Sequence, residues 1–370
     1  MSFKVGLVGL PNVGKSTLFN ALTKSSVPAQ NYPFCTIDPH IAIAPMPDAR
    51  LEHLKQLYNS AKIIPNSVTF VDIAGLVKGA ATGEGLGNKF LNNIREVDVI
   101  LHVIRCFDDA DIIHTSSTID PLEDFTIINT ELMLKDLEAI ENRTEKIAQL
   151  IKKAAQDPKQ KKELETELAL LQKITQAINK SDVAAIGKLI AESAVATIPL
   201  LAAKKFLIVA NINEDDLTGK SYTNNQYFKK LVENFGPEKI IPISAKIEGE
   251  LAQLSQGDAQ EMMDLIGLQE PGLDKVIRSS YHALGLISFF TCGPKEIHAW
   301  AIEKNLPVRK AAGKIHSDLE RGFICSDVFN YTDLAEYKTE SKLKDLGKIR
   351  TEGQDYIMRD GDILHVKFNV

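Results

Sequence analysis

The chain has 370 residues, which is about two to three times the length of a typical domain and favours more than one folded unit. Hydrophobic residues make up 44% and charged residues 25% of the chain, proportions that exclude wholesale disorder, collagen and low-complexity sequence. The formal net charge of -6 is too acidic for the whole surface to attract nucleic acid, so any such contact requires a local basic patch.

The cysteines and the apolar runs indicate where the protein resides. Neither a disulfide framework nor a zinc site is predicted, because no C-x-x-C pair or regular spacing links Cys35, Cys106, Cys292 and Cys325. No apolar run approaches the roughly 20 residues that span a bilayer, and the strand-like start is unlike a signal peptide. We therefore expect a cytoplasmic protein that does not bind membranes.

Apolar, largely β-branched segments recur along the chain and predict buried parallel strands at 3–8, 68–72, 97–104, 206–210 and 240–243. Helical stretches lie between them, for example at 16–24 and 49–60. Strands that alternate with helices in this way predict a doubly wound, mostly parallel α/β sheet. We place this domain at residues 1–284.

The alternation is interrupted by a segment rich in Glu, Lys, Leu and Gln, which we assign to an insertion over 129–198. Its apolar residues follow a heptad in two stretches: Leu137, Ile140, Thr144, Ile147 and Ile151, then Leu164, Leu168, Leu171, Thr175 and Ile178. Asp157 and Pro158 separate the stretches, which predicts an antiparallel helical hairpin resembling a coiled coil, with two ordinary packed helices as the alternative. Lysines gather at the expected tip and form either a solvated face or an RNA or protein contact: Lys152, Lys153, Lys159, Lys161 and Lys162.

A different pattern follows Pro271, and we expect a small α+β unit at 285–368. Within it, segments 287–291, 295–300 and 362–368 predict a strand, a short helix and a strand. Residues 359–362 predict the turn before the last strand.

The strongest local signal is G-L-P-N-V-G-K-S at 9–16, which fits G-x-x-x-x-G-K-S between a predicted strand and a predicted helix. Its glycines would let successive main-chain N–H groups and the helix N-terminus face a polyphosphate. Lys15 would reach the outer phosphates, Ser16 would give its hydroxyl to Mg²⁺, and Thr17 would meet the α-phosphate. We therefore assign nucleotide binding to Asn12, Val13, Gly14, Lys15, Ser16 and Thr17.

Further motifs follow in the order of a switch-type NTPase. Asp72 ends a predicted strand and begins D-I-A-G, where it would hold the metal through water while the N–H of Gly75 senses the γ-phosphate. Thr36, in the loop before it, can give Mg²⁺ a second hydroxyl. Base recognition is expected after two later strands, at Asn211, Ile212, Glu214, Ser244 and Ala245.

These motifs, with N-Y-P-F-C-T at 31–36, D-I-A-G-L-V-K-G-A at 72–80 and G-E-G-L-G-N at 83–88, resemble the Obg-related NTPases, most closely the YchF or Obg-like ATPase family. The similarity covers essentially the whole chain. It includes the helical insertion and a C-terminal unit, with A-G-K-I-H at 312–316 and D-G-D at 360–362, that is similar to the β-grasp TGS domain. The resemblance implies a P-loop NTPase fold, ATP as the nucleotide, and the ribosome or another translation component as the partner.

The base-reading motif departs from the usual N-K-x-D of guanine readers. Asn211 is retained, but Ile212 replaces the lysine and Glu214 stands in the place of the aspartate. Losing paired hydrogen bonds to guanine can cost several orders of magnitude in selectivity, whereas adenine could bond to an amide and to main-chain groups near Asn211 and Ile212. We therefore prefer ATP, and a shifted loop that still accepts GTP is the alternative.

The sequence lacks the glutamine that orients the attacking water in many switch GTPases, because Leu76 occupies the position directly after D-x-x-G. Of three histidines near the motifs, His40 is expected in a turn and His102 as a satisfied core residue, whereas His114 lies on a polar stretch that could swing over the nucleotide. We assign catalytic roles to Lys15, Asp72, Gly75 and His114, for in-line attack of water with Mg²⁺ and with slow turnover. Asn12 could also ligate K⁺.

The leading hypothesis is an ATP-driven switch whose hairpin and TGS-like unit carry its state to the ribosome or another translation component. The basic tip and a C-terminal cluster could meet RNA phosphate, the cluster being Arg309, Lys310, Lys314, His316 and Arg321. One alternative is a non-enzymatic scaffold that nucleotide stabilises, which the missing glutamine favours. Another is a P-loop kinase, which the lack of an arginine-rich lid disfavours.

Overall fold

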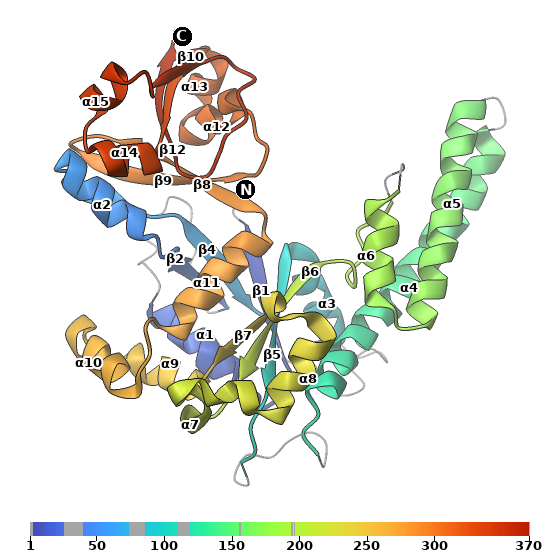
Figure 1. The fold of residues 1–370 in the computed structure, drawn as a ribbon. Coiled ribbons are helices and arrows are strands. Elements are labelled where there is room, and N and C mark those ends of the chain that lie inside the picture. Colours follow the sequence, from blue (N-terminus) through green and yellow to red (C-terminus); the bar gives the residue numbers. More distant parts are fainter. Residues whose placement is uncertain are drawn as a thin grey trace.

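A computed structural model describes residues 3–25, 40–73, 86–109, 118–154, 157–193, 195 and 197–369. These residues form two six-stranded sheets and a pair of long helices that projects away from both sheets (Figure 1). No helix in these described ranges combines the length and apolar character needed to cross a membrane.

The first sheet has the order β2-β4-β1-β5-β6-β7, and its neighbours run parallel except for β2 and β4. Its strands are β1 (Lys4–Val8), β2 (Ile41–Pro45), β4 (Ser67–Asp72), β5 (Val99–Arg105), β6 (Lys205–Asn211) and β7 (Ile240–Ile243). The five predicted strands are confirmed with their ends shifted by about two residues at most, as is the mostly parallel α/β fold class. The strand β2 was not predicted, because it has only five residues and all of them are apolar, so no alternation with polar residues marks it as a strand.

Helices pack against this sheet through apolar side chains. Leu18 and Leu22 of α1 and Val276 of α11 share a buried cluster with Val5 and Leu7 of β1. The elements of this domain outside the sheet are α1 (Lys15–Lys24), α3 (Leu86–Glu96), α7 (Glu214–Leu217), η4 (Thr218–Asn224), α8 (Gln226–Phe235), η5 (Pro237–Lys239), α9 (Ala245–Leu251), α10 (Gln256–Ile266) and α11 (Gly272–Ala283). Because β1, β4, β5, β6 and β7 are parallel, the loops after them meet at one edge of the sheet.

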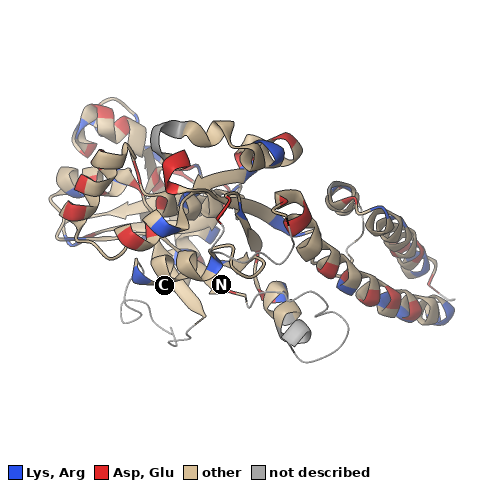
Figure 2. Ribbon diagram, turned by 90° about the horizontal axis from the view of Figure 1, so that it is seen from below, with Lys and Arg blue, Asp and Glu red and all other residues tan. Residues whose placement is uncertain are grey.

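The projecting helices are α4 (Pro121–Lys153) and α5 (Pro158–Asn179), followed by α6 (Val183–Ala191). They lie side by side in opposite directions, and the predicted heptad residues Ile140, Ile147, Leu171 and Ile178 are buried together, which confirms the antiparallel hairpin (Figure 1). Lys and Arg alternate with Asp and Glu along the hairpin (Figure 2). The first helix begins at Pro121, earlier than the predicted insertion, because Asp120 accepts a hydrogen bond from the N–H of Leu122 and starts it there.

The second sheet has the order β11-β10-β12-β8-β9-β3. Its elements are β3 (Lys62–Ile64), β8 (Leu286–Cys292), β9 (Glu296–Glu303), β10 (Phe323–Asn330), β11 (Arg350–Glu352) and β12 (Asp362–Phe368), with α12 (Val308–Ile315), α13 (Ser317–Arg321), α14 (Tyr331–Tyr337) and α15 (Glu340–Asp345). The predicted strands at 287–291 and 362–368 are confirmed. The helix predicted at 295–300 is wrong, because β9 occupies these residues: Ile297 and Ala299 are buried while His298 and Trp300 are half-buried, the two-residue period of a strand.

The two sheets are joined by residues that precede the predicted boundary at 284/285. Strand β3 pairs in parallel with β9, and Leu51 and Leu54 of α2 (Ala49–Tyr58) pack against Phe290 and Ile297 of the second sheet. The helix predicted at 49–60 is therefore present, but it covers the second sheet and not the first. The domain ranges themselves stay a prediction.

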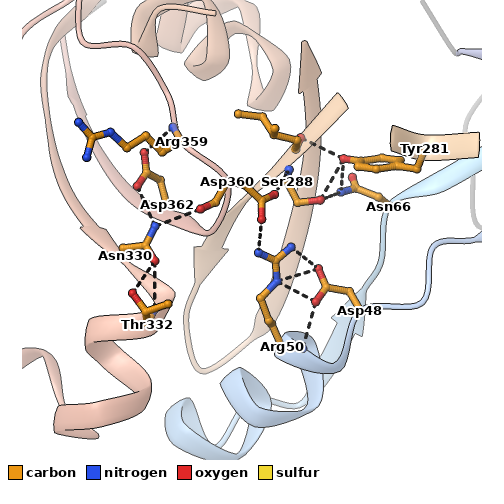
Figure 3. A network of polar contacts seen from close by, with 11 residues as sticks. Asp48, Arg50, Asn66, Tyr281, Ser288, Asn330, Thr332, Arg359, Asp360 and Asp362 are labelled. Carbon is orange, nitrogen blue, oxygen red and sulfur yellow. Dashed lines mark hydrogen bonds and ion pairs between the residues drawn. The ribbon is translucent and has the colours of Figure 1, made fainter. Parts of the chain in front are cut away.

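A polar network crosses this junction (Figure 3). Arg50 of α2 forms an ion pair of 2.6 Å with Asp360, and Asp360 accepts a hydrogen bond of 2.9 Å from the main-chain N–H of Ser288. The hydroxyl of Ser288 lies 3.0 Å from the Asn66 amide nitrogen and 2.9 Å from the Tyr281 hydroxyl. Residues of α2, of α11 and of the segment before β4 thus share one set of hydrogen bonds with β8 of the second sheet, which ties the two parts of the molecule together.

Candidate functional site

The loop between β1 and α1 has a backbone that only a few residue types tolerate. Asn12 and Gly14 have φ of 64° and 95°, in the left-handed region. A Cβ at Gly14 would lie 2.4 Å from Nδ2 of Asn211, so space also restricts this position to glycine. Helix α1 begins at Lys15 without a side-chain cap, which leaves the N–H groups of its first turn for an anionic ligand.

A cavity of about 920 Å³ opens in front of this helix terminus. It brings together most of the residues that the sequence assigned to nucleotide binding, although they come from three separate parts of the chain. Its lining is Gly9, Leu10, Pro11, Asn12, Gly14, Lys15, Ser16, Thr17, Phe107, Asn211, Ala245, Lys246, Gly249, Glu250 and Gln253. Ser16 and Thr17 are exposed, whereas the side chain of Val13 is buried, so only its main chain can serve a ligand.

The ammonium group of Lys15 forms an ion pair with the carboxylate of Asp72. Asp72 ends β4, next to Leu7 of β1, and the two paired side chains are only 11% and 18% exposed. The parallel pairing of β1 and β4 thus carries the carboxylate to the phosphate loop, as the motif order predicted. Asp72 and the hydroxyl of Ser16 are oxygen donors of the kind that Mg²⁺ prefers, so these residues fit that ion. The described residues contain no group of three or more His, Cys, Asp or Glu arranged to hold a metal.

Asn211 ties the phosphate loop to the loop after β7. Its Nδ2 donates a hydrogen bond of 2.9 Å to the carbonyl of Val13, and its Oδ1 accepts one of 2.9 Å from the N–H of Ala245. The side chain is 4% exposed, so both bonds are protected from water. Nδ2 carries two hydrogens and one bonds to Val13, so the other can serve a ligand in the cavity that Asn211 lines.

The other predicted base-site residues take different positions. Ile212 is buried among core side chains and its N–H bonds to the carbonyl of Ile243 at 2.8 Å, so its side chain does not line the cavity. Glu214 forms an ion pair of 2.9 Å with Lys246, which does line it. This hydrogen-bonded partner raises the pKa of Lys246. Ser244 is buried and precedes α9, where its carbonyl accepts the N–H of Glu248.

Two residues at the end of β5 belong to the site but were not predicted. Phe107 lines the cavity. Arg105 fixes the position of Phe107, because its guanidinium donates hydrogen bonds of 3.0 Å to the carbonyls of Phe107 and Asp109. The guanidinium carbon also lies 4.7 Å from the Phe107 ring centroid. Arg105 is 1% exposed. An arginine at the end of a strand that is otherwise apolar except for His102 was the available signal, since a buried arginine requires several acceptors.

Several predicted residues lie outside the described part of the chain: Thr36, Gly75, Leu76 and His114. His102 is buried as expected, against Phe125 at 4.7 Å between ring centroids. Its Nδ1 has no hydrogen-bond partner, so the expectation of a satisfied core histidine is wrong for this atom. Burial lowers the pKa of His102 to about 3, which keeps the ring neutral.

Two family models match the chain. One, described as a 50S ribosome-binding GTPase, matches residues 4–180. The other, YchF-GTPase_C, is described as a protein of unknown function and matches residues 286–369. The first match covers the chain from β1 to the end of α5, and the second covers it from β8 to β12.

Full-length relatives and solved structures are similar throughout. The ribosome-binding ATPase YchF of Haemophilus ducreyi is 44% identical, and that of Bacillus subtilis 42% identical, each over 100% of both chains. The structure of the Schizosaccharomyces pombe YchF GTPase has a TM-score of 0.83 at 37% identity and covers 99% of this chain and 98% of that one. A GTP-binding protein from Pyrococcus horikoshii, at 20% identity and a TM-score of 0.60 over 99% and 100% of the two chains, shares the fold.

Proposed function

The chain belongs to the YchF family, and from that premise we propose that it is a ribosome-binding ATPase that works as a molecular switch. Relatives at 42% to 45% identity over 99% to 100% of their length carry the name ribosome-binding ATPase. The observation that carries the proposal is the cavity lined by Lys15 at an uncapped helix N-terminus, with Asp72 held against Lys15 by an ion pair. We place the protein in the cytoplasm and assign its second sheet to a TGS-like β-grasp unit.

The proposed reaction is in-line attack of water on the γ-phosphate of ATP. A bond forms between the water oxygen and phosphorus while the bond to the bridging oxygen breaks, which yields ADP and phosphate. The N–H groups at the start of α1 and the ammonium of Lys15 stabilise the negative charge on the phosphate oxygens. Ser16 and Asp72, with Thr36 from the sequence motif, would hold Mg²⁺, which supplies further positive charge when bound. Gly75 and His114 keep their proposed roles, and Asn12 its proposed role toward K⁺.

The altered base loop favours ATP over GTP. A guanine-binding site needs a free carboxylate to accept hydrogen bonds from N1 and N2 of the base. The carboxylate of Glu214 instead forms an ion pair with Lys246, with oxygen–nitrogen distances of 2.9 and 3.1 Å. Ile212, in the place of the usual lysine, is turned into the core. Adenine makes no demand for an anionic acceptor, so this site discriminates against guanine.

Calorimetry with ATP and with GTP in Mg²⁺ buffer tests the nucleotide assignment, and we expect ATP to bind more tightly. Phosphate release should disappear in Lys15→Ala and persist in Lys24→Ala, which removes an exposed lysine from the last turn of the same helix. Preferential binding of GTP would refute the assignment. Equal phosphate release by wild type and Lys15→Ala would favour the scaffold hypothesis instead.

The hairpin tip is the better candidate for contact with ribosomal RNA. In the C-terminal cluster, Lys310 and Arg321 are already paired with Glu320 and Asp318 at 2.5 and 3.0 Å. At the tip, Lys159 and Lys162 are exposed, and no ion pair with another described residue engages them. We therefore assign the RNA contact first to the tip and second to the TGS-like unit.

Co-sedimentation with ribosomes at increasing salt tests this contact. Lys159→Glu with Lys162→Glu should weaken binding and reduce its salt dependence, because fewer counterions are released from phosphate. Lys173→Glu with Lys180→Glu changes the net charge equally at the base of the same hairpin and should bind as wild type does. Equal loss in both double variants would exclude a specific tip contact.

A further inference from the structure

A second large cavity, of about 1010 Å³, lies at the end of β6 opposite the nucleotide site. Asn211, the last residue of β6, lines the nucleotide cavity, whereas Lys205, Phe206 and Leu207 at its start line the second one. A strand of this length spans about 20 Å, so the two cavities are separate. The walls come from α4, α6, α8 and α11 as well as from β6, and this volume is at the upper end of the range for ligand sites.

The interior of this cavity is aromatic. Phe125 of α4, Phe206 of β6 and Phe235 of α8 line it, and their ring centroids lie 4.5 to 5.8 Å apart. His102 lies against Phe125 and Phe206, and its unpartnered Nδ1 leaves one buried polar atom in this ring cluster. Phe125 is 6% exposed and belongs to the core cluster of this domain, whereas Phe206 and Phe235 pack against that cluster and stay partly exposed. Partly exposed aromatic rings in a cavity are typical of a binding site.

The polar groups around the rings are mostly positive. The cavity is lined by four lysines and by one acidic residue, Asp182; the lysines are Lys188, Lys204, Lys205 and Lys239. The carboxylate of Asp182 caps α6 by accepting a hydrogen bond from the N–H of Ala185. Lys188 forms an ion pair of 3.9 Å with Glu192, and Nζ of Lys204 donates hydrogen bonds to the carbonyls of Arg95 and Val97. Lys205 and Lys239 are the two that form no ion pair with a carboxylate among the described residues, and their charge is available to a ligand. In a chain with a net charge of -6, this local excess of positive charge favours an anionic ligand.

The arrangement of the rings favours a peptide over a nucleic acid as the ligand. Single-stranded RNA binds by stacking bases on open aromatic faces. Here Nζ of Lys239 lies 4.6 Å from the Phe206 centroid and occupies one face of that ring, and the Phe125 and Phe235 rings pack against Phe206 at interplanar angles of 51° and 87°. Because one face of Phe206 is occupied and Phe125 is only 6% exposed, these rings offer little open face for a stacked base, whereas an aromatic or aliphatic side chain can enter between ring edges.

We propose that this cavity binds an acidic peptide segment of a partner protein, which inserts an aromatic or aliphatic side chain among the three phenylalanines and sets its carboxylates against Lys205 and Lys239. Because Leu122 and Phe125 belong to α4 and Val183 and Lys188 to α6, the peptide contacts the helical insertion as well as the sheet. The bound segment therefore bridges the base of the hairpin and the nucleotide-binding body.

Gly187 provides a variant that closes the cavity without removing a charge. It lines the cavity within α6, and a Cβ built on it meets no atom within 4 Å, so a larger side chain enters open space. Gly187→Phe should fold normally, since replacing a glycine inside a helix improves its helix propensity. Gly187→Ala is the matched control, because it adds one methyl group and leaves the cavity open.

The binding measurement is fluorescence anisotropy on the full chain with saturating ADP and Mg²⁺. The probe is a fluorescein-labelled peptide in which a Phe-Leu pair is flanked on both sides by runs of Glu; the comparison peptides replace Phe-Leu by Ser-Ser, or Glu by Lys. We expect saturable binding of the acidic Phe-Leu peptide alone. Its Kd should rise by at least about tenfold in Gly187→Phe and in Lys205→Glu with Lys239→Glu. It should be unchanged in Gly187→Ala and in Lys304→Glu with Lys344→Glu, two exposed lysines beyond α11.

Several results would overturn the proposal. It fails if the acidic peptide shows no saturable binding up to about 1 mM, or if it binds equally to wild type and to Gly187→Phe. Displacement of the peptide by oligouridine would assign the cavity to nucleic acid instead. The outcome is independent of ATP hydrolysis, because Lys15→Ala should retain peptide binding in full.

Discussion

Replacing Asn211 with alanine tests whether the base loop and the phosphate loop act as one unit. The substitution removes two buried hydrogen bonds of 2.9 Å, one to the carbonyl of Val13 and one from the N–H of Ala245. Both main-chain groups would stay buried without a partner. The phosphate loop would also lose the contact that holds Gly14, whose φ is 95°.

The expected cost follows from these two bonds. Leaving one buried polar group unsatisfied costs about 1 to 3 kcal/mol, so two groups give about 2 to 6 kcal/mol. We expect this cost to be divided between the free energy of unfolding and the affinity for ATP, with Kd rising by about 10- to 100-fold. Asn211→Asp should be at least as damaging, because it sets a carboxylate oxygen against the carbonyl of Val13 while it keeps the acceptor for Ala245.

Urea unfolding and calorimetry with ATP measure the two parts. Asn234→Ala serves as the matched control, because its amide donates a hydrogen bond of equal length, 2.9 Å, to the carbonyl of Lys230 on an exposed surface. That control should change stability by less than about 0.5 kcal/mol and leave ATP affinity unchanged. If Asn211→Ala bound ATP within about threefold of wild type and unfolded at the same urea concentration, the coupling of the two loops would be refuted.

Three further predictions concern the loop, the junction of the sheets and the pH dependence. Gly14→Ala should abolish ATP binding in calorimetry, because its Cβ would lie 2.4 Å from Nδ2 of Asn211 and φ is 95°; retained binding would contradict the assigned loop geometry. Arg50→Met removes the ion pair with Asp360 and should lower the free energy of unfolding by about 1 to 2 kcal/mol in urea, whereas an unshifted curve would show that this pair does not stabilise the junction. Burial raises the pKa of Asp136 to about 6, so the folded chain binds this proton more tightly than the unfolded chain does. Stability should therefore fall as pH rises from about 4 to about 6, and Asp136→Asn should remove about 3 kcal/mol of that decrease, which urea unfolding at several pH values checks.

The fold could be predicted wherever one segment carries its own periodic signal. The strands β1, β4, β5, β6 and β7 are continuous apolar runs, and their ends are correct to within about two residues. The hairpin was visible in its heptads. By contrast, the helix predicted at 295–300 is the strand β9, because six residues do not distinguish the two periods and the pairing with β8 decides the matter.

The residues of the candidate site also divide into those that a sequence motif predicts and those that only the folded structure identifies. Gly14, Lys15, Ser16 and Thr17 were identified because they are contiguous, and Asp72 because its motif has a fixed order. Phe107 and its support Arg105 carry no such pattern. Their role arises only when the end of β5 is brought beside the phosphate loop.

The sequence by itself determined the phosphate loop and the departure from the guanine-reading motif, because main-chain N–H groups of contiguous residues bind phosphate and a few side chains read the base. Tertiary structure alone decided that α2 and β3 pack on the second sheet and that Asn211 braces the phosphate loop. It also decided that β6 ends in one cavity and begins in another. These arrangements join residues far apart in the chain, and only the burial and hydrogen bonding of the folded state select such partners.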